Sequence, residues 1–107
     1  MGEEMNLGAK QERFSYMLMQ LLVFIHSKGY KIRFGHAQRC ENCVTGHKNS
    51  LHKLKLAVDL NLLKDNVLLE KSEEHLEPGL YWESIGGTWG GRWGDGNHYS
   101  LSYRGMK

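Results

Sequence analysis

Large apolar residues alternate with polar or small ones along residues 54–62 of this sequence. The apolar positions are Leu54, Leu56, Val58, Leu60 and Leu62. Because successive side chains of a strand point to opposite faces, this period of two predicts a β-strand with one buried face. Asp59 lies between two of these positions, so we expect its carboxylate on the face opposite to the leucines.

A second apolar pattern, earlier in the chain, has the period of a helix. Its members are Phe14, Met17, Leu18, Leu21, Leu22 and Ile25. This spacing of i, i+3, i+4 and i+7 predicts an amphipathic helix whose stripe packs on a core. Lys28 and Gly29 are typical of a helix C-terminus, so we expect the helix to end there. The segment from Tyr30 to Phe34 then alternates apolar with basic residues, which predicts a strand with one face inward.

The remaining patterns predict shorter elements. Lys64-Asp65-Asn66 is typical of a hairpin turn and precedes a short predicted strand, Val67 to Leu69. Ser72-Glu73-Glu74 favours the start of a short helix before Pro78 and Gly79. Later elements are a helical turn at Leu80 to Ile85, a glycine-rich loop at Gly86 to Gly96, and a strand at His98 to Tyr103. A helix followed by strands and short helices indicates an α+β fold.

Length and charge narrow the classes of protein. With 107 residues the chain is expected to form a single domain, residues 1–107. A net charge of +2 is too small to indicate a nucleic-acid partner, and aromatic residues and lysines are not interleaved on one strand face. The longest apolar run, Tyr16 to Ile25, is too short to span a bilayer, and the N-terminus lacks the basic region of a signal peptide. We therefore expect a soluble protein, synthesised in the cytoplasm, and a monomer.

Six histidines in so short a chain raise the expectation of metal chemistry. The candidate ligands at the edges of predicted strands are His52, Asp59 and His98, and Asp95 lies three residues before His98. A catalytic zinc ion needs three protein ligands and one open position. His52 and Asp59 would face opposite ways on one regular strand, so His52 must precede the strand. Spacing alone leaves a simpler interpretation open for each acid. Asp59 would be an exposed strand residue, and Asp95 would be a turn residue between glycines.

Three motifs in this order resemble a known family. They are Ser50-x-His52-x4-Ala57-x-Asp59, Trp89-Gly90-Gly91-Arg92-Trp93 and Asp95-x2-His98. Together they resemble the zinc D-alanyl-D-alanine carboxypeptidase and L-alanyl-D-glutamate endopeptidase family, which includes many phage endolysins. The resemblance covers residues 32–103 and implies a small α+β fold with an antiparallel sheet, shared with the Hedgehog signalling domain.

The resemblance implies a role for each matching residue. His52, Asp59 and His98 would bind Zn²⁺, Asp95 would be the catalytic acid/base, and Arg39 would face the substrate. Two positions depart from the family pattern. Lys55 stands where relatives commonly have glycine, which leaves the loop geometry open, and Ser100 stands where many have an acidic residue.

The implied activity is hydrolysis of a bond in peptidoglycan stem peptides. L-alanyl-D-glutamate is the preferred bond and D-alanyl-D-alanine the next, in an endolysin of a phage or prophage that reaches the cell wall after the membrane is permeabilised. A zinc-binding module of the same fold without catalysis is the alternative. Zinc lowers the pKa of bound water to about 7. Asp95 would transfer the proton, helped by partial burial under Trp89 and Trp93, and the guanidinium of Arg39 would pair with a carboxylate or an oxyanion.

The other notable residues have simpler interpretations. Cys40 and Cys43 either form a structural zinc site with His36 and His47 or remain unligated thiols, and two cysteines exclude a disulfide-stapled scaffold. The three tryptophans are expected to anchor the core and loops more than to bind substrate. His26 and His75 are expected to face solvent.

Overall fold

The computed structural model describes residues 6–35 and 55–103. The elements are α1 (Leu7–Ser27), β1 (Lys31–Gly35), β2 (Ala57–Lys64), β3 (Val67–Leu68), the 3₁₀ helix η1 (Ser72–His75), α2 (Leu76–Ser84), β4 (Thr88–Trp89), the 3₁₀ helix η2 (Gly90–Trp93) and β5 (His98–Ser100). The predictions for Arg39, His52 and the cysteine loop concern residues outside these ranges.

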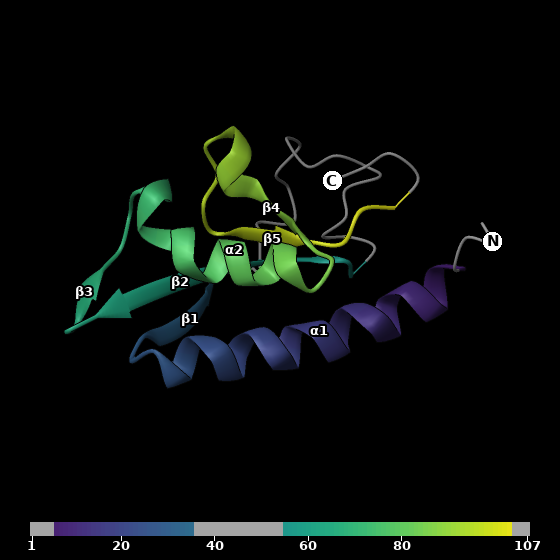
Figure 1. Cartoon of the computed structure of the whole chain (residues 1–107), viewed down its shortest axis with the longest axis horizontal. Helices are drawn as coiled ribbons and strands as arrows, with labels where there is room; N and C mark the ends of the chain where they lie inside the picture. The colour runs from purple at the N-terminus through teal and green to yellow at the C-terminus, as the bar shows by residue number, and fades with distance from the viewer. Residues whose placement is uncertain (1–5, 36–54, 104–107) are drawn as a thin grey trace, which may run out of the picture.

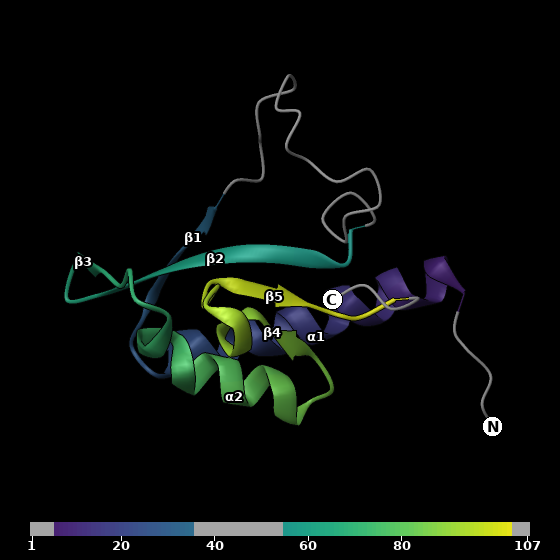
Figure 2. The same ribbon diagram turned by 90° about the horizontal axis from the view of Figure 1, so that it is seen from above.

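The strands form one antiparallel sheet in the order β1-β2-β5-β4, and β3 pairs with the end of β2. Both helices cover the same face of this sheet (Figures 1 and 2). The opposite face is turned away from the helices and carries the candidate site. This arrangement confirms the predicted α+β fold with a small antiparallel sheet, an N-terminal amphipathic helix and short helices.

Helix α1 follows the predicted stripe. Its buried residues are Phe14, Met17, Leu21 and Ile25. At its start the Asn6 side chain caps the helix by accepting a hydrogen bond from the Ala9 backbone N–H at 2.7 Å. At its end Gly29 has a positive φ of 91°, which confirms the predicted stop. Among the described residues, no helix has the length and apolarity to cross a membrane.

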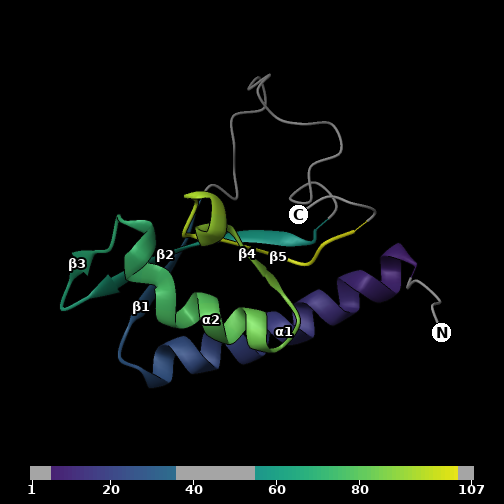
Figure 3. The same ribbon diagram turned by 45° about the horizontal axis from the view of Figure 1, so that its top comes forward.

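The core lies between the helices and the sheet. Trp82 of α2 is fully buried and meets the rings of Phe14 and Tyr99 edge-on, with centroids 5.7 and 6.2 Å apart. Its indole N–H donates to the Ser100 carbonyl at 2.8 Å, which ties α2 to β5. Phe24 of α1 stacks on the ring of Tyr81 in α2. Figure 3 shows the two helices side by side beneath the sheet.

The hairpin between β2 and β3 confirms the predicted turn. Asp65 and Asn66 both have positive φ, 55° and 66°. Two consecutive left-handed residues are the hallmark of the tight hairpin turn whose twist matches that of the strands, and Asp and Asn tolerate this conformation.

Two expectations about packing are wrong. Phe34 was expected to face inward, but 57% of its surface is exposed. β1 is an edge strand that diverges from α1 along its length, so no helix covers its far end (Figure 2). Pro78 and Gly79 were expected to follow a helix, yet both lie inside α2. Pro78 is in the first turn, where its missing N–H costs no helical hydrogen bond.

Candidate functional site

Asp59 and His98 lie directly opposite each other on neighbouring strands. β2 and β5 pair antiparallel with Asp59 in register with His98, so both side chains emerge on the same face of the sheet. The distance from His98 Nδ1 to Asp59 Oδ1 is 3.8 Å, and both side chains are largely shielded from solvent. Leu60 and Leu62 are fully buried in the core, so Asp59 is on the expected face.

The spacing of these two atoms fits a shared metal ion. Zinc binds imidazole nitrogen and carboxylate oxygen at about 2.0–2.2 Å, so two donors at a tetrahedral angle are about 3.4 Å apart. The observed 3.8 Å is close to that separation. Within residues 6–35 and 55–103, no group of three potential ligands comes together. A zinc site with three protein ligands would therefore include a donor outside these residues.

Asp95 sits in a tight turn that leads into β5. Its backbone N–H donates to the Gly90 carbonyl at 2.9 Å, and its own carbonyl accepts from the His98 N–H at 3.1 Å. Asp95 and His98 are thus joined by a direct backbone hydrogen bond. The expected burial of Asp95 under tryptophans is wrong, because the residue is exposed.

Gly90 allows this turn to close. A Cβ built on Gly90 would collide with the Asp95 carbonyl oxygen and would lie 2.7 Å from His98 Cβ. The backbone of η2 therefore packs directly against both candidate residues. A bidentate ion pair between Arg92 and Glu83, at 2.6 and 2.8 Å, fastens η2 to α2.

The tryptophans divide between anchoring and exposure. Trp82 and Trp89 are buried, and the Trp89 indole N–H donates to the Gly96 carbonyl at 2.7 Å, which confirms the expected anchoring role for both. Trp93 differs, because 48% of its surface is exposed and its ring lies 5.8 Å from that of His98. The exposed Trp93 ring thus borders the candidate site.

Gly35 and Lys55 flank segment 36–54, and Gly35 lies next to Asp59. Gly35, the last residue before the segment, pairs with Asp59 across β1 and β2. Lys55, the first residue after it, has a φ of 61°. This left-handed conformation is one that glycine adopts readily and lysine rarely, and it occurs at the position where the family pattern has glycine.

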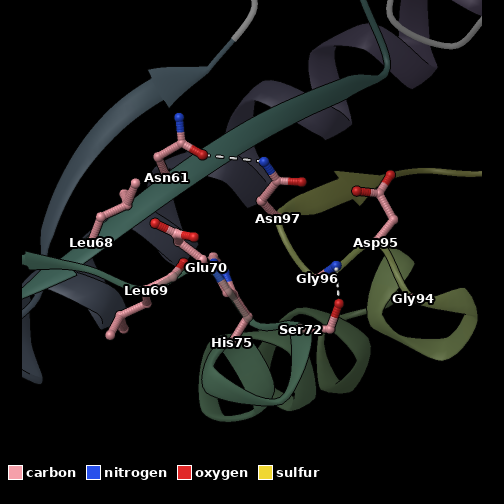
Figure 4. A pocket seen from close by; sticks show the side chains of 10 residues that line it. All are labelled: Asn61, Leu68, Leu69, Glu70, Ser72, His75, Gly94, Asp95, Gly96 and Asn97. Atoms are coloured by element: carbon pink, nitrogen blue, oxygen red, sulfur yellow. Dashed lines mark hydrogen bonds between the residues drawn. The ribbon is translucent and has the colours of Figure 1, made fainter.

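A pocket of about 260 Å³ adjoins Asp95 (Figure 4). It occupies a gap along β2, because residues 57–59 pair with β5 and residues 63–64 pair with β3. Asn61 lies in that gap and accepts a hydrogen bond from the Asn97 amide at 3.1 Å. The lining residues are Asn61, Leu68, Leu69, Glu70, Ser72, His75, Gly94, Asp95, Gly96 and Asn97.

Sequence analysis missed this pocket. Asn61 lies two residues after Asp59 on the same strand, and Asn97 lies inside the Asp95-x2-His98 motif. The period of two could have placed Asn61 beside Asp59. Glu70 and Ser72 carry no local signal, because only the hairpin and η1 bring them to the gap.

His75 was expected to face solvent, and this is wrong: only 3% of its surface is exposed. Its Nε2 lies 3.2 Å from the Leu69 carbonyl, which can only accept, so Nε2 carries a proton. Its Nδ1 lies 3.3 Å from the Tyr99 hydroxyl and accepts from it. Burial lowers the pKa of His75 and raises that of Tyr99, so both groups stay neutral at neutral pH.

Protein stability is therefore expected to fall as the pH drops below about 6.5, the ordinary pKa of histidine. The folded pKa of His75 is lowered, so the unfolded chain binds its proton more readily and acid favours unfolding. Urea unfolding at pH 7.5 and 5.5, with chelator present, should show a smaller pH difference for His75→Gln than for the wild type. His26→Gln, at an exposed position of α1, serves as the control and should keep the wild-type difference.

Comparison with known proteins places this site in a family. A model of the D-alanyl-D-alanine carboxypeptidase family matches residues 44–101, more than half of the 107-residue chain. The chain belongs to this family and is accordingly a peptidase of the kind that acts on peptidoglycan. The matched segment includes the strand pair of Asp59 and His98 and the Asp95 turn. No curated protein and no solved structure matches the chain.

Proposed function

We propose that the protein is a zinc-dependent peptidase that hydrolyses a bond in the stem peptides of peptidoglycan. The observation that carries this proposal is the cross-strand pair of Asp59 and His98, whose facing donor atoms are 3.8 Å apart inside the segment that matches the family. His52 is proposed as the third ligand. It lies in segment 36–54, and Gly35, the residue before that segment, pairs with Asp59.

The proposed chemistry divides among a few residues. Zinc, when bound, would supply Lewis acidity and lower the pKa of water, so that hydroxide is available to attack an amide at neutral pH. Asp59 and His98 would hold the ion at the sheet face. Asp95 accepts the proton of the attacking water and delivers it to the leaving amine. Arg39 binds a substrate carboxylate or the developing oxyanion through its fork of N–H donors.

The preferred bond in this proposal is L-alanyl-D-glutamate, with D-alanyl-D-alanine as the rival. The resemblance to compact endolysins supports this order, and it also supports a lytic role for the protein in a phage or prophage. The enzyme would then act on the cell wall once a partner has permeabilised the membrane.

Digestion of purified peptidoglycan tests the proposal. The zinc-loaded protein should release new amino termini, and their identity reports which bond is cut. Addition of a chelator such as EDTA should abolish the release, and added Zn²⁺ should restore it. Because the ion would make hydroxide available at neutral pH, we expect a loss of rate of roughly a hundredfold or more without it.

Two results would contradict the proposal. Hydrolysis that continues at the full rate after chelation would exclude a required metal ion. Zinc binding at one ion per chain with no hydrolysis of peptidoglycan would instead favour the alternative, a zinc-binding module without catalysis.

A further inference from the structure

The pocket in the gap of β2 has acidic walls. The charged side chains that line it are Glu70 and Asp95, and no lysine or arginine is among the lining residues. Figure 4 shows Glu70 on one side of the pocket and Asp95 on the other, with Asn97 between them and Asn61 above Glu70. A bound group therefore meets negative charge from two sides.

The uncharged polar groups that line the pocket already form hydrogen bonds within the protein. These bonds determine which donors and acceptors remain for a ligand. The Ser72 hydroxyl accepts from the Gly96 N–H at 3.0 Å, and the Asn97 amide N–H donates to the Asn61 carbonyl oxygen at 3.1 Å. This leaves the side-chain oxygen of Asn97 as an acceptor. Both ring nitrogens of His75 are hydrogen-bonded, and burial keeps the ring uncharged. The pocket thus offers mainly acceptors to a ligand.

The volume of the pocket suits one side chain of a larger ligand. Sites that enclose a whole small molecule measure roughly 300–1,000 Å³. At about 260 Å³ this pocket is smaller, and Asp95 lies on its wall. A peptide whose scissile bond lies at Asp95 would place a neighbouring side chain in the pocket.

We propose that this pocket binds the ammonium group of a diamino acid, such as lysine, in the peptide substrate, and that Glu70 is its main charge partner. The inference rests on the proposed function, because it takes Asp95 to mark the position of the scissile bond. Glu70 is then a specificity-determining residue, distinct from the residues that act on the bond itself.

The test compares two synthetic peptides that differ by a single charge. Both have the sequence L-alanyl-D-glutamyl-L-lysyl-D-alanyl-D-alanine with an acetylated amino terminus, and in one the lysine side chain is also acetylated. Hydrolysis is followed with these peptides. Affinity is measured by calorimetry with hydrolysis-resistant versions, methylated at both candidate scissile nitrogens. The proteins are zinc-loaded wild type, Glu70→Gln and the control Glu73→Gln, which alters an exposed acid of η1 that does not line the pocket.

Wild type and Glu73→Gln should bind the amine peptide about threefold to tenfold more tightly than the acetylated one, as expected for partly exposed charge pairs. In Glu70→Gln the ratio should fall toward one. Equal affinities in the wild type, or a ratio unchanged in Glu70→Gln, would overturn the pocket assignment even if both peptides were cleaved. If the ratio behaves as expected but neither peptide is cleaved, the pocket assignment stands and the proposed peptidase function fails.

Discussion

Asp95→Asn is expected to lower the rate of stem-peptide hydrolysis by about 10²–10⁴-fold while the protein still binds one zinc ion, the loss typical of removing a general acid/base. The carboxamide keeps the size and the backbone hydrogen bonds of Asp95, to Gly90 and from His98. What it loses is the ability to accept a proton from water and pass it on. Initial rates with the stem pentapeptide, together with the zinc content of the purified variant, measure the two effects separately.

Asp65→Asn provides a matched control for this variant. Asp65 is exposed in the turn between β2 and β3, outside the pocket, and its left-handed backbone conformation suits asparagine equally well. The Asp65→Asn variant should hydrolyse the stem pentapeptide at the wild-type rate. If Asp95→Asn kept at least one third of the wild-type rate, Asp95 would be a turn residue without a part in catalysis. If the variant lost its zinc, Asp95 would act on the metal site and not on the proton.

Features set by local sequence were predicted correctly. The stripe from Phe14 to Ile25 predicted α1, and the alternation up to Leu62 predicted β2 with Asp59 on the face away from the core. Asp65 and Asn66 gave the turn, because these residue types tolerate positive φ. Each of these features depends on a few neighbouring residues, so the sequence pattern alone carries the information.

Features set by contacts between distant segments were missed. Phe34 alternates like a core residue, but the divergence of β1 from α1 leaves it exposed. His75 is buried because the Leu69 carbonyl and the Tyr99 hydroxyl, on two other segments, meet it in space. The gap between β5 and β3 along β2, which forms the pocket, likewise exists only once three strands are paired. None of these arrangements has a periodic signature.

Gly90→Ala is expected to damage both stability and activity. The added Cβ would collide with the Asp95 carbonyl and lie 2.7 Å from His98 Cβ and 3.2 Å from Asp95 Cβ, nearer than the 3.4–4 Å of ordinary contact. These neighbours are a backbone oxygen and the first side-chain carbons of two constrained residues, which cannot swing aside. We expect a loss of about 1–3 kcal/mol in the free energy of unfolding, the usual cost of overpacking.

The added Cβ should also displace Asp95 and His98 and so slow hydrolysis by about 10²-fold, because a shift of about 1 Å in a reacting group is enough to do so. Urea unfolding measures the free energy of unfolding, and initial rates at temperatures well below the unfolding midpoint measure the rate of hydrolysis. Gly8→Ala is the control: its Cβ would have Asn6 Oδ1 at 3.6 Å as its nearest neighbour, and alanine in α1 should stabilise the fold by up to about 1 kcal/mol. A Gly90→Ala protein with wild-type stability and rate would show that the turn of Asp95 and His98 can shift freely, and the geometry of this turn could then not be what positions Asp95 for proton transfer.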